Sequence, residues 1–158
     1  MALLHELLRG SPVLLDTFSS KKMLYDKFPK IKYNDALMIY GSDKPDLRNP
    51  LKIYEITDIF SRDDVKFDIF KKLVKKGSIV RGIVTKQTSN QPRSFFDNLD
   101  KWAKTEGASG LAYFTIEKDK IISGKGPVGK FFSEDSLKEI MKITSAEVGD
   151  SIFLACGT

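Results

Sequence analysis

The sequence predicts an α/β sandwich in which helices pack on one face of a sheet of mixed or antiparallel strands. Three observations support this class. Residues 78–85 (SIVRGIVT) are rich in β-branched side chains, which favour strands. Residues 94–107 carry apolar side chains at helical spacing and end in glycine. From residue 51 onward the expected order is strand, helix, strand, helix, hairpin, helix, strand, which is typical of helices packed on a sheet.

The N-terminal segment, residues 1–30, is interpreted as an arm. Residues 3–8 (LLHELL) suggest a short helix, and apolar side chains within residues 24–28 recur at helical spacing before Pro29. The segment lacks the basic start and the continuous apolar core of a signal peptide. No stretch of the chain approaches the ~20 apolar residues of a membrane span, so we expect no membrane partner.

A short helix is expected after the arm, with Asn34 as its N-cap and Gly41 just past its end. The string GSDKPD follows as a turn, in which Pro45 fixes φ and Asp43 can bond its own backbone.

Four further segments are expected in turn. Residues 50–60 (PLKIYEITDIF) alternate partly and predict a strand. Residues 67–76 place Phe67, Phe70 and Val74 on one face of a helix that Gly77 ends. The strand over 78–85 is followed by a polar loop, QTSNQPR.

The helix over 94–107 is the clearest of the chain. Ser94 and Asp97 form a weak capping-box pattern. An apolar stripe follows, which we interpret as core packing in preference to a platform for stacking bases. Its members are Phe95, Phe96, Leu99, Trp102 and Ala103.

The last third of the chain predicts a hairpin over 110–126, a helix capped by Ser133 and a buried strand over 151–156. Between hairpin and helix, GKGPVGKFFS is glycine-rich and basic. It lacks the GK[ST] of a phosphate-binding loop, so we interpret it as a connection whose glycines allow tight turns.

Composition narrows the function classes. The chain has 158 residues, 41% hydrophobic and 30% charged, which suits one globular domain with an arm. A single cysteine, Cys156, excludes an internal disulfide framework and a cysteine zinc site, and the lone His5 argues against a histidine triad or metal cluster.

Charge is unevenly distributed along the chain. Residues 76–130 hold ten Lys/Arg and five Asp/Glu, a net charge of +5, whereas residues 131–158 hold two and five, a net charge of −3. The basic middle is the part of the chain that suggests a polyanionic partner, although a solvated lysine-rich surface explains the same charges.

The chain carries none of the common catalytic signatures. The chain contains no GxSxG, HExxH, dinucleotide fingerprint or P-loop. The paired acids Asp63–Asp64 and Glu134–Asp135 are adjacent in sequence, so they do not readily face one pocket. From its residues alone the chain indicates a binding or structural module, with no catalytic, cofactor or metal residues of its own.

At YGSDKPDLR, residues 40–48, the sequence resembles bacterial-type aspartyl-tRNA synthetases, in which this string leads into an inserted domain. The resemblance covers roughly residues 29–158, and residues 1–28 match less clearly. It continues in order through KIYEITDIF, FDIFKKLVKKGSIVRGIV, EGASGLAYFTIE, GPVGKFFSEDSLKEIM and VGDSIFLACGT. This insert, the GAD domain, is shared with amidotransferase subunits that act on misacylated tRNA.

The resemblance implies an α+β fold: a two-layer α/β sandwich of the GAD and DCoH-like kind, with a mainly antiparallel sheet and helices packed on one face. It divides the chain into residues 1–50, a flanking arm from a class II catalytic core that includes the GSDKPDLR junction, and residues 51–158, the GAD insert.

The parent class of enzyme activates aspartate with ATP and transfers it to tRNA. This chain shows no FRxE-like string and no glycine-rich segment ending in an arginine motif. We therefore expect it to be inactive alone, with ATP and Mg²⁺ needed only by the full cytoplasmic enzyme.

The resemblance also supplies site candidates and leaves three functions open. The chain is an RNA-facing module near the tRNA acceptor end, a structural brace for the catalytic core without RNA contact, or a free-standing relative in an amidotransferase-like complex. Candidates for contact with the core at the junction are Asp43, Lys44, Asp46 and Arg48. Candidates for weak contacts to the tRNA phosphate backbone are Arg81, Lys86, Arg93, Lys125 and Lys130.

Overall fold

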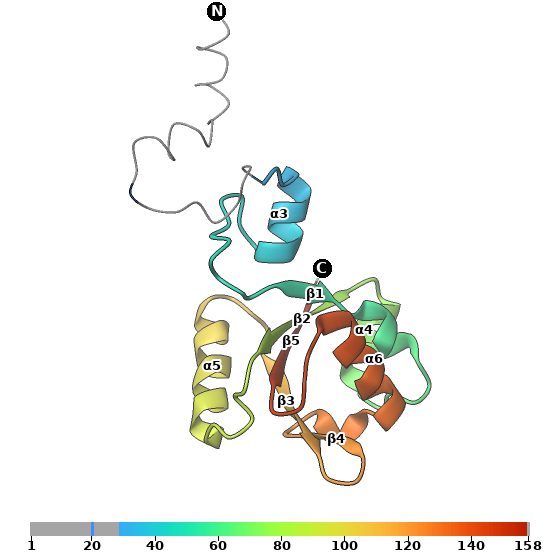
Figure 1. Ribbon diagram of the computed structural model, residues 1–158. Helices are drawn as coiled ribbons and strands as arrows, with labels where there is room; N and C mark the ends of the chain where they lie inside the picture. Colours follow the sequence, from blue (N-terminus) through green and yellow to red (C-terminus); the bar gives the residue numbers. More distant parts are fainter. Residues whose placement is uncertain (1–19, 21–28, 158) are drawn as a thin grey trace, which may run out of the picture.

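Five antiparallel strands form one sheet at the centre of the computed structural model, which describes residue 20 and residues 29–157 (Figure 1). The strand order is β1-β2-β5-β3-β4, so the C-terminal strand lies in the middle. This confirms the α+β class and the antiparallel sheet. The strands are β1 (Ile53–Glu55), β2 (Ile79–Thr85), β3 (Ala112–Lys118), β4 (Ile122–Lys125) and β5 (Ser151–Gly157).

Four α-helices and two short 3-10 helices occur among the described residues, and none of these helices is long and apolar enough to cross a membrane. The helix suggested by residues 3–8 and the helical spacing within residues 24–28 lie outside the described residues. The helices are α3 (Tyr33–Tyr40), η1 (Thr57–Ser61), α4 (Asp68–Lys75), α5 (Arg93–Thr105), η2 (Gly129–Phe131) and α6 (Glu134–Thr144).

The larger core fills one face of the sheet, where α4 and α6 lie together (Figure 1). Ile152 and Leu154 of β5 and Phe114 of β3 reach it and have no exposed surface. Helix α6, which packs on this face, contributes Ile140, which also has no exposed surface. Because side chains alternate along a strand, the residues between these positions point to the other face.

Helix α5 lies on that other face, which departs from the expectation that all helices share one face (Figure 1). Phe96 stacks on Tyr113 with ring centroids 4.2 Å apart and also contacts Phe153. Tyr113 and Phe153 point away from the main core, so burying them requires a cover on the second face. The predicted role of Phe96 in core packing is thus correct, but in a second, smaller core.

Trp102 does not belong to the buried stripe, since its side chain is 60% exposed. Trp102 comes six positions after Phe96, which at 3.6 residues per turn places it about 120° around the helix. Ala103 lies closer to the face of Phe96 and is buried.

The strand expected over 50–60 is shorter than predicted, because the chain turns after Glu55. Ile56 leaves the extended conformation, and η1 buries Ile59 and Phe60 in the main core. Thr57 supports this turn, since its hydroxyl accepts a hydrogen bond of 3.1 Å from the backbone N–H of Val80. Alternating apolar residues fit a 3-10 helix here as well as a strand.

The C-terminal ends of the helices, marked by glycine, were predicted correctly, whereas only one of the three N-terminal caps was. Gly41 and Gly77 have positive φ of 70° and 93° just past α3 and α4. Ser133 caps α6 by accepting the N–H of Ser136 at 3.0 Å. The caps expected at Asn34 and Ser94 are wrong, because α3 begins at Tyr33 and α5 at Arg93, which places both residues inside the first turn, and no side chain caps either helix.

Candidate nucleic-acid interface

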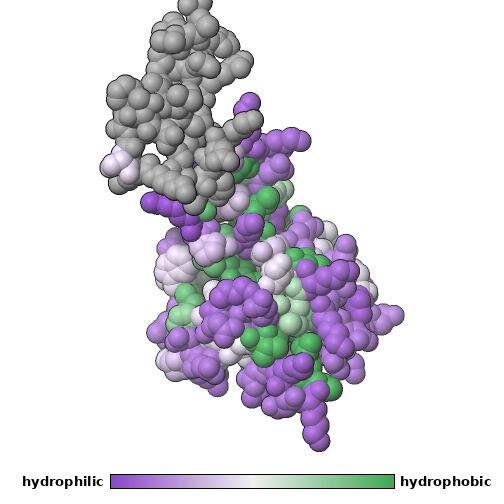
Figure 2. Space-filling view, in the orientation of Figure 1, coloured by the Kyte–Doolittle hydropathy of each residue, from purple (hydrophilic) through white to green (hydrophobic). Residues whose placement is uncertain are grey.

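Two of the five candidate phosphate-binding residues, Arg93 and Lys125, line one open cleft of about 510 Å³. Arg93 is the first residue of α5 and Lys125 is the last residue of β4. The cleft lies on the α5 face of the sheet. On the face of the molecule seen in Figure 2, hydrophilic side chains cover most of the surface, with smaller apolar patches between them.

The cleft is built by the pleat of β3. Tyr113, Thr115 and Glu117 alternate onto the same face and line the cleft, while the residues between them point into the main core. Lys125 pairs in register with Thr115 across the sheet, so these two side chains stand side by side. Tyr113 and Phe96 are almost fully buried and form the apolar base.

Charges of both signs meet at this cleft. Lys125 forms an ion pair with Glu117, whose hydrogen bond and charge raise the pKa of the ammonium. The Nε atom of Arg93 lies 3.5 Å from the carboxylate of Asp97, one turn later in α5. Burial is the main cause of the raised pKa of Tyr113. Both cations remain more than half exposed, at 66% for Lys125 and 84% for Arg93.

Lys86 is placed differently, because its ammonium bonds to the protein itself. It donates to the carboxylate of Asp150 at 3.0 Å and to the backbone carbonyl of Ser145 at 2.9 Å. Asp150 also accepts the backbone N–H groups of Gln87 and Glu147. Burial opposes ionisation of Asp150, but these hydrogen bonds outweigh it, and the pKa of Asp150 lies below its ordinary value.

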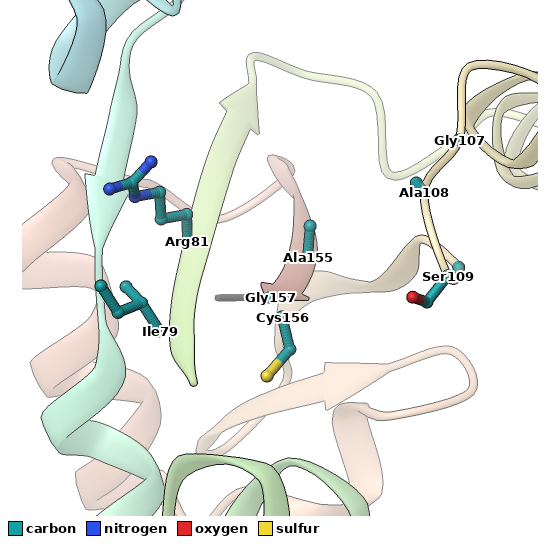
Figure 3. A pocket seen from close by; sticks show the side chains of 9 residues that line it. Ile79, Arg81, Gly107, Ala108, Ser109, Ala155, Cys156 and Gly157 are labelled. Carbon is teal, nitrogen blue, oxygen red and sulfur yellow. The ribbon is translucent and has the colours of Figure 1, made fainter. Parts of the chain in front are cut away.

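Arg81 lines a second open cleft of about 410 Å³, on the bare part of the sheet between α3 and the end of α5 (Figure 3). Its guanidinium approaches the sulfur of Met38 at 2.9 Å. Cys156 also lines this cleft, and burial raises the pKa of its thiol. The fifth candidate, Lys130, stands 5.2 Å from the ring centre of Phe131.

The junction candidates form a local cluster. Asp46 binds the guanidinium of Arg48 through both carboxylate oxygens and also accepts its backbone N–H at 3.0 Å. These contacts, the side-chain bond first, lower the pKa of Asp46 to about 2. Lys44 donates its backbone N–H to Ser42. The local turn bond expected from Asp43 is thus made by Ser42 and Asp46, while Asp43 lines a further open cleft of about 440 Å³ beside α3.

Thr115 and Glu117 are among the cleft residues that sequence reasoning missed. Both belong to the run LAYFTIE, whose sequence predicts a strand and nothing more. The side of the sheet on which they lie could have been predicted from their alternation with the buried Phe114 and Ile116. Within residue 20 and residues 29–157, no three side chains of His, Cys, Asp or Glu gather closely enough to hold a metal ion.

Comparison with known proteins gives a consistent result. The GAD domain family model matches residues 70–158. An aspartate–tRNA(Asp/Asn) ligase of Pelagibacter ubique is 69% identical over 140 residues, covering 89% of this chain and 24% of the relative. Ligases of the same name from Ehrlichia canis and Beijerinckia indica are 49% and 44% identical, covering 93% and 98% of this chain and 25% and 26% of the relatives. The chain spans about a quarter of the length of these relatives.

Proposed function

Because the chain belongs to the GAD domain family, we propose that it is the non-catalytic inserted domain of an aspartate–tRNA ligase and lies near the acceptor end of the bound tRNA. The relatives named above are ligases of that type, and the chain corresponds to a small part of each. In this proposal the remainder of the parent enzyme binds ATP and Mg²⁺ and carries out aspartylation. The insert supports the reaction by holding tRNA.

The observation that carries the proposal is the shared cleft of Arg93 and Lys125. These residues are far apart in the sequence, yet the fold brings both cations to one hollow on the α5 face. Exposed cations around a cleft suit a phosphate backbone, which they position without reading base sequence. Arg81 lines the neighbouring cleft of the same face and extends the surface available to RNA.

Lys86 and Lys130 contribute less directly. The ammonium of Lys86 is already bound by Asp150 and Ser145, so its contribution to RNA binding is expected to be the smallest of the five candidates. Lys130 follows the cleft residues Gly126 and Pro127 in the chain without lining the cleft itself. We keep Lys130 as a flanking contact.

A fluorescence-anisotropy titration tests the proposal. The 158-residue chain is titrated against tRNA(Asp), tRNA(Asn) and an unrelated tRNA at two salt concentrations. Saturable binding that weakens with salt and drops on Lys125→Ala or Arg81→Ala is the expected result. Equal affinity for all three tRNAs indicates backbone contact without identity readout. No binding at low salt contradicts autonomous RNA binding.

A brace for the catalytic core is the second candidate, because α3 presents apolar side chains to solvent. Tyr33 is 65% exposed and Met38 53% exposed, and both flank the junction loop. Apolar side chains on a short exposed helix favour packing against another body. If tRNA binding fails, slower amide hydrogen exchange of α3 in the complete enzyme than in the 158-residue chain supports this role.

A free-standing domain in an amidotransferase-like complex is the third candidate, and none of the relatives named above is an amidotransferase subunit. The reading frame around the gene distinguishes it. Flanking codons that encode the class II catalytic motifs identify an inserted domain, whereas a stop codon directly after Thr158 identifies a separate protein.

A further inference from the structure

Thr115 stands in the Arg93–Lys125 cleft with a hydroxyl that is not bonded to any described residue. The side chain is 5% exposed and lines the cleft. Among the residues that the structure describes, every fully buried side-chain nitrogen or oxygen has a hydrogen-bond partner. The hydroxyl of Thr115 has none, so its small exposed surface is turned into the cleft. A nearly buried, unpartnered hydroxyl is costly unless a ligand or water bonds to it.

The neighbours of Thr115 show that this hydroxyl is exceptional. Thr85, Ser151, Thr115 and Lys125 lie in register across four adjacent strands, from β2 to β4. The first two belong to a closed network, since Thr88 bonds to the hydroxyls of both Thr85 and Ser151 at 2.6 and 2.8 Å. The row of polar side chains therefore has its open end at Thr115 and Lys125.

The start of α5 faces the same cleft and is arranged for an anion. No side chain caps this helix, whose N-cap is Pro92, so N–H groups of its first turn lack a side-chain acceptor. Arg93, at the first helical position, adds positive charge at the end where the helix dipole already favours anions. A phosphate group complements both features. The ion pair of Arg93 with Asp97 is long, at 3.5 Å from Nε, and the Arg93 side chain is 84% exposed. The five N–H donors of a guanidinium therefore leave capacity for a phosphate.

Glu117 argues against inorganic phosphate alone as the ligand, because its carboxylate repels an anion. Its ion pair with Lys125 does not saturate the carboxylate, because two carboxylate oxygens offer about four acceptor positions and can still accept a hydroxyl proton. Thr115 and Glu117 are two residues apart on one strand, roughly 6.6 Å. A sugar hydroxyl between them can donate to Glu117 and accept from Thr115.

From these contacts we infer that the cleft binds one ribose–phosphate unit of an RNA strand and selects it through the 2′-hydroxyl. The phosphate lies at Arg93, Lys125 and the start of α5, and the 2′-hydroxyl lies at Thr115 and Glu117. The cleft volume of about 510 Å³ is in the range of small-ligand pockets. This inference rests on the proposed function for its choice of RNA as partner, and it adds discrimination between RNA and DNA.

Recognition in this cleft is independent of base identity. Phe96 and Tyr113 stack on each other, and at 3% and 9% exposure neither offers a ring face to a base. In this proposal, the polar residues that line the cleft contact only the sugar and the phosphate. Single-stranded uridine oligomers are therefore suitable probes, because oligo-rU and oligo-dU differ only in the 2′-hydroxyl.

The test is an anisotropy titration of the 158-residue chain with labelled oligo-rU and oligo-dU of equal length at low salt. We expect oligo-rU to bind about three- to tenfold more tightly, as one or two hydrogen bonds provide. Thr115→Val removes the hydroxyl at nearly constant shape and should reduce this preference, because only the bond to Glu117 remains, whereas Thr115→Ser keeps it. Arg93→Ala weakens both oligomers by a similar factor.

Two matched controls accompany these variants. Thr105→Val removes an exposed hydroxyl from the far end of α5, and Lys142→Ala removes a cation from α6, on the other face; neither should change the preference. Equal binding of oligo-rU and oligo-dU, or an unchanged preference in Thr115→Val, overturns the inference even where tRNA binds as proposed. Failure of tRNA binding, by contrast, contradicts the proposed function.

Discussion

Lys86 donates a hydrogen bond of 3.0 Å to Asp150, a carboxylate without exposed surface that also holds two backbone N–H groups. This relationship ties the end of β2 to the turn before β5, the central strand. It assigns Lys86, a residue chosen from the sequence for RNA contact, a structural contribution that does not require RNA.

Removing this carboxylate should therefore destabilise the fold. Asp150→Ala leaves two backbone N–H groups without an acceptor and the Lys86 ammonium with only the carbonyl of Ser145. We expect a loss of roughly 3 kcal/mol in the free energy of unfolding. Lys86→Ala should cost about 1 kcal/mol, because the carboxylate keeps its backbone partners. Urea denaturation measures both, with Lys142→Ala as the surface control. A smaller effect for Asp150→Ala than for Lys86→Ala contradicts this assignment.

Acid should destabilise the protein through Asp64 as well as Asp150. Hydrogen bonds from Arg62, and then from Ser133 at the start of α6, hold the pKa of Asp64 well below its usual range. An aspartate with a depressed folded-state pKa contributes stability above its unfolded pKa of about 3.9, and loses that contribution as pH falls through the folded pKa. The free energy of unfolding should therefore decrease as pH falls below about 4.

The variant Asp64→Asn isolates this contribution. It should be less stable than the wild type near neutral pH and show a smaller decrease on acidification. Urea denaturation of both proteins at about pH 6 and about pH 3 measures the difference. Parallel decreases in the two proteins would show that Asp64 does not contribute to acid sensitivity.

Close backbone contact, in addition to turn formation, explains one glycine of the GKGPVGKFFS connection. A Cβ added at Gly129 would overlap the backbone carbonyl group of Gly124, which cannot move aside cheaply. We expect Gly129→Ala to destabilise the protein by about 2 kcal/mol or more. Gly110→Ala, whose nearest neighbour would lie 3.7 Å away, is the matched control. Thermal denaturation of the two variants compares them, and equal midpoints contradict the close approach.

Under the proposed function, the junction loop should matter only within the longer parent enzyme. In the 158-residue chain, Arg48→Ala removes an exposed ion pair with Asp46 and should leave the urea midpoint essentially unchanged. If the loop ties the insert to the catalytic core, Arg48→Ala and Asp43→Ala lower aminoacylation by the complete enzyme. Unchanged aminoacylation rates would assign these residues to a solvated turn.

Much of the fold follows from local signals, because glycine conformation, strand composition and the Ser133 cap act over a few residues. The side of the sheet on which α5 packs does not follow from such local signals. Its stripe shows that Phe96 is buried, but only the pairing of β3 with β5 places Tyr113 and Phe153 together beneath it. The turn after Glu55 was missed for a similar reason, since Ile59 and Phe60 are equally compatible with a strand.

The candidate site shows the same limit. Charge along the chain identified Arg93 and Lys125 separately, whereas their meeting depends on strand order and on the start of α5. The partner of Lys86, Asp150, lies 64 positions away and could not be paired with it from sequence. For Thr115, alternation along the strand indicates the face on which it lies but not a ligand contact, because a threonine in a strand is ordinary.

The salt dependence of tRNA(Asp) binding tests the central claim, that the Arg93–Lys125 cleft is an RNA interface. The wild-type chain, Arg93→Ala, Lys125→Ala and the control Lys142→Ala are titrated over a series of salt concentrations by anisotropy. Arg93→Ala and Lys125→Ala should each weaken binding and reduce the slope of log K against log salt by about one, while Lys142→Ala leaves the slope unchanged. Wild-type slopes in both cleft variants would contradict the claim.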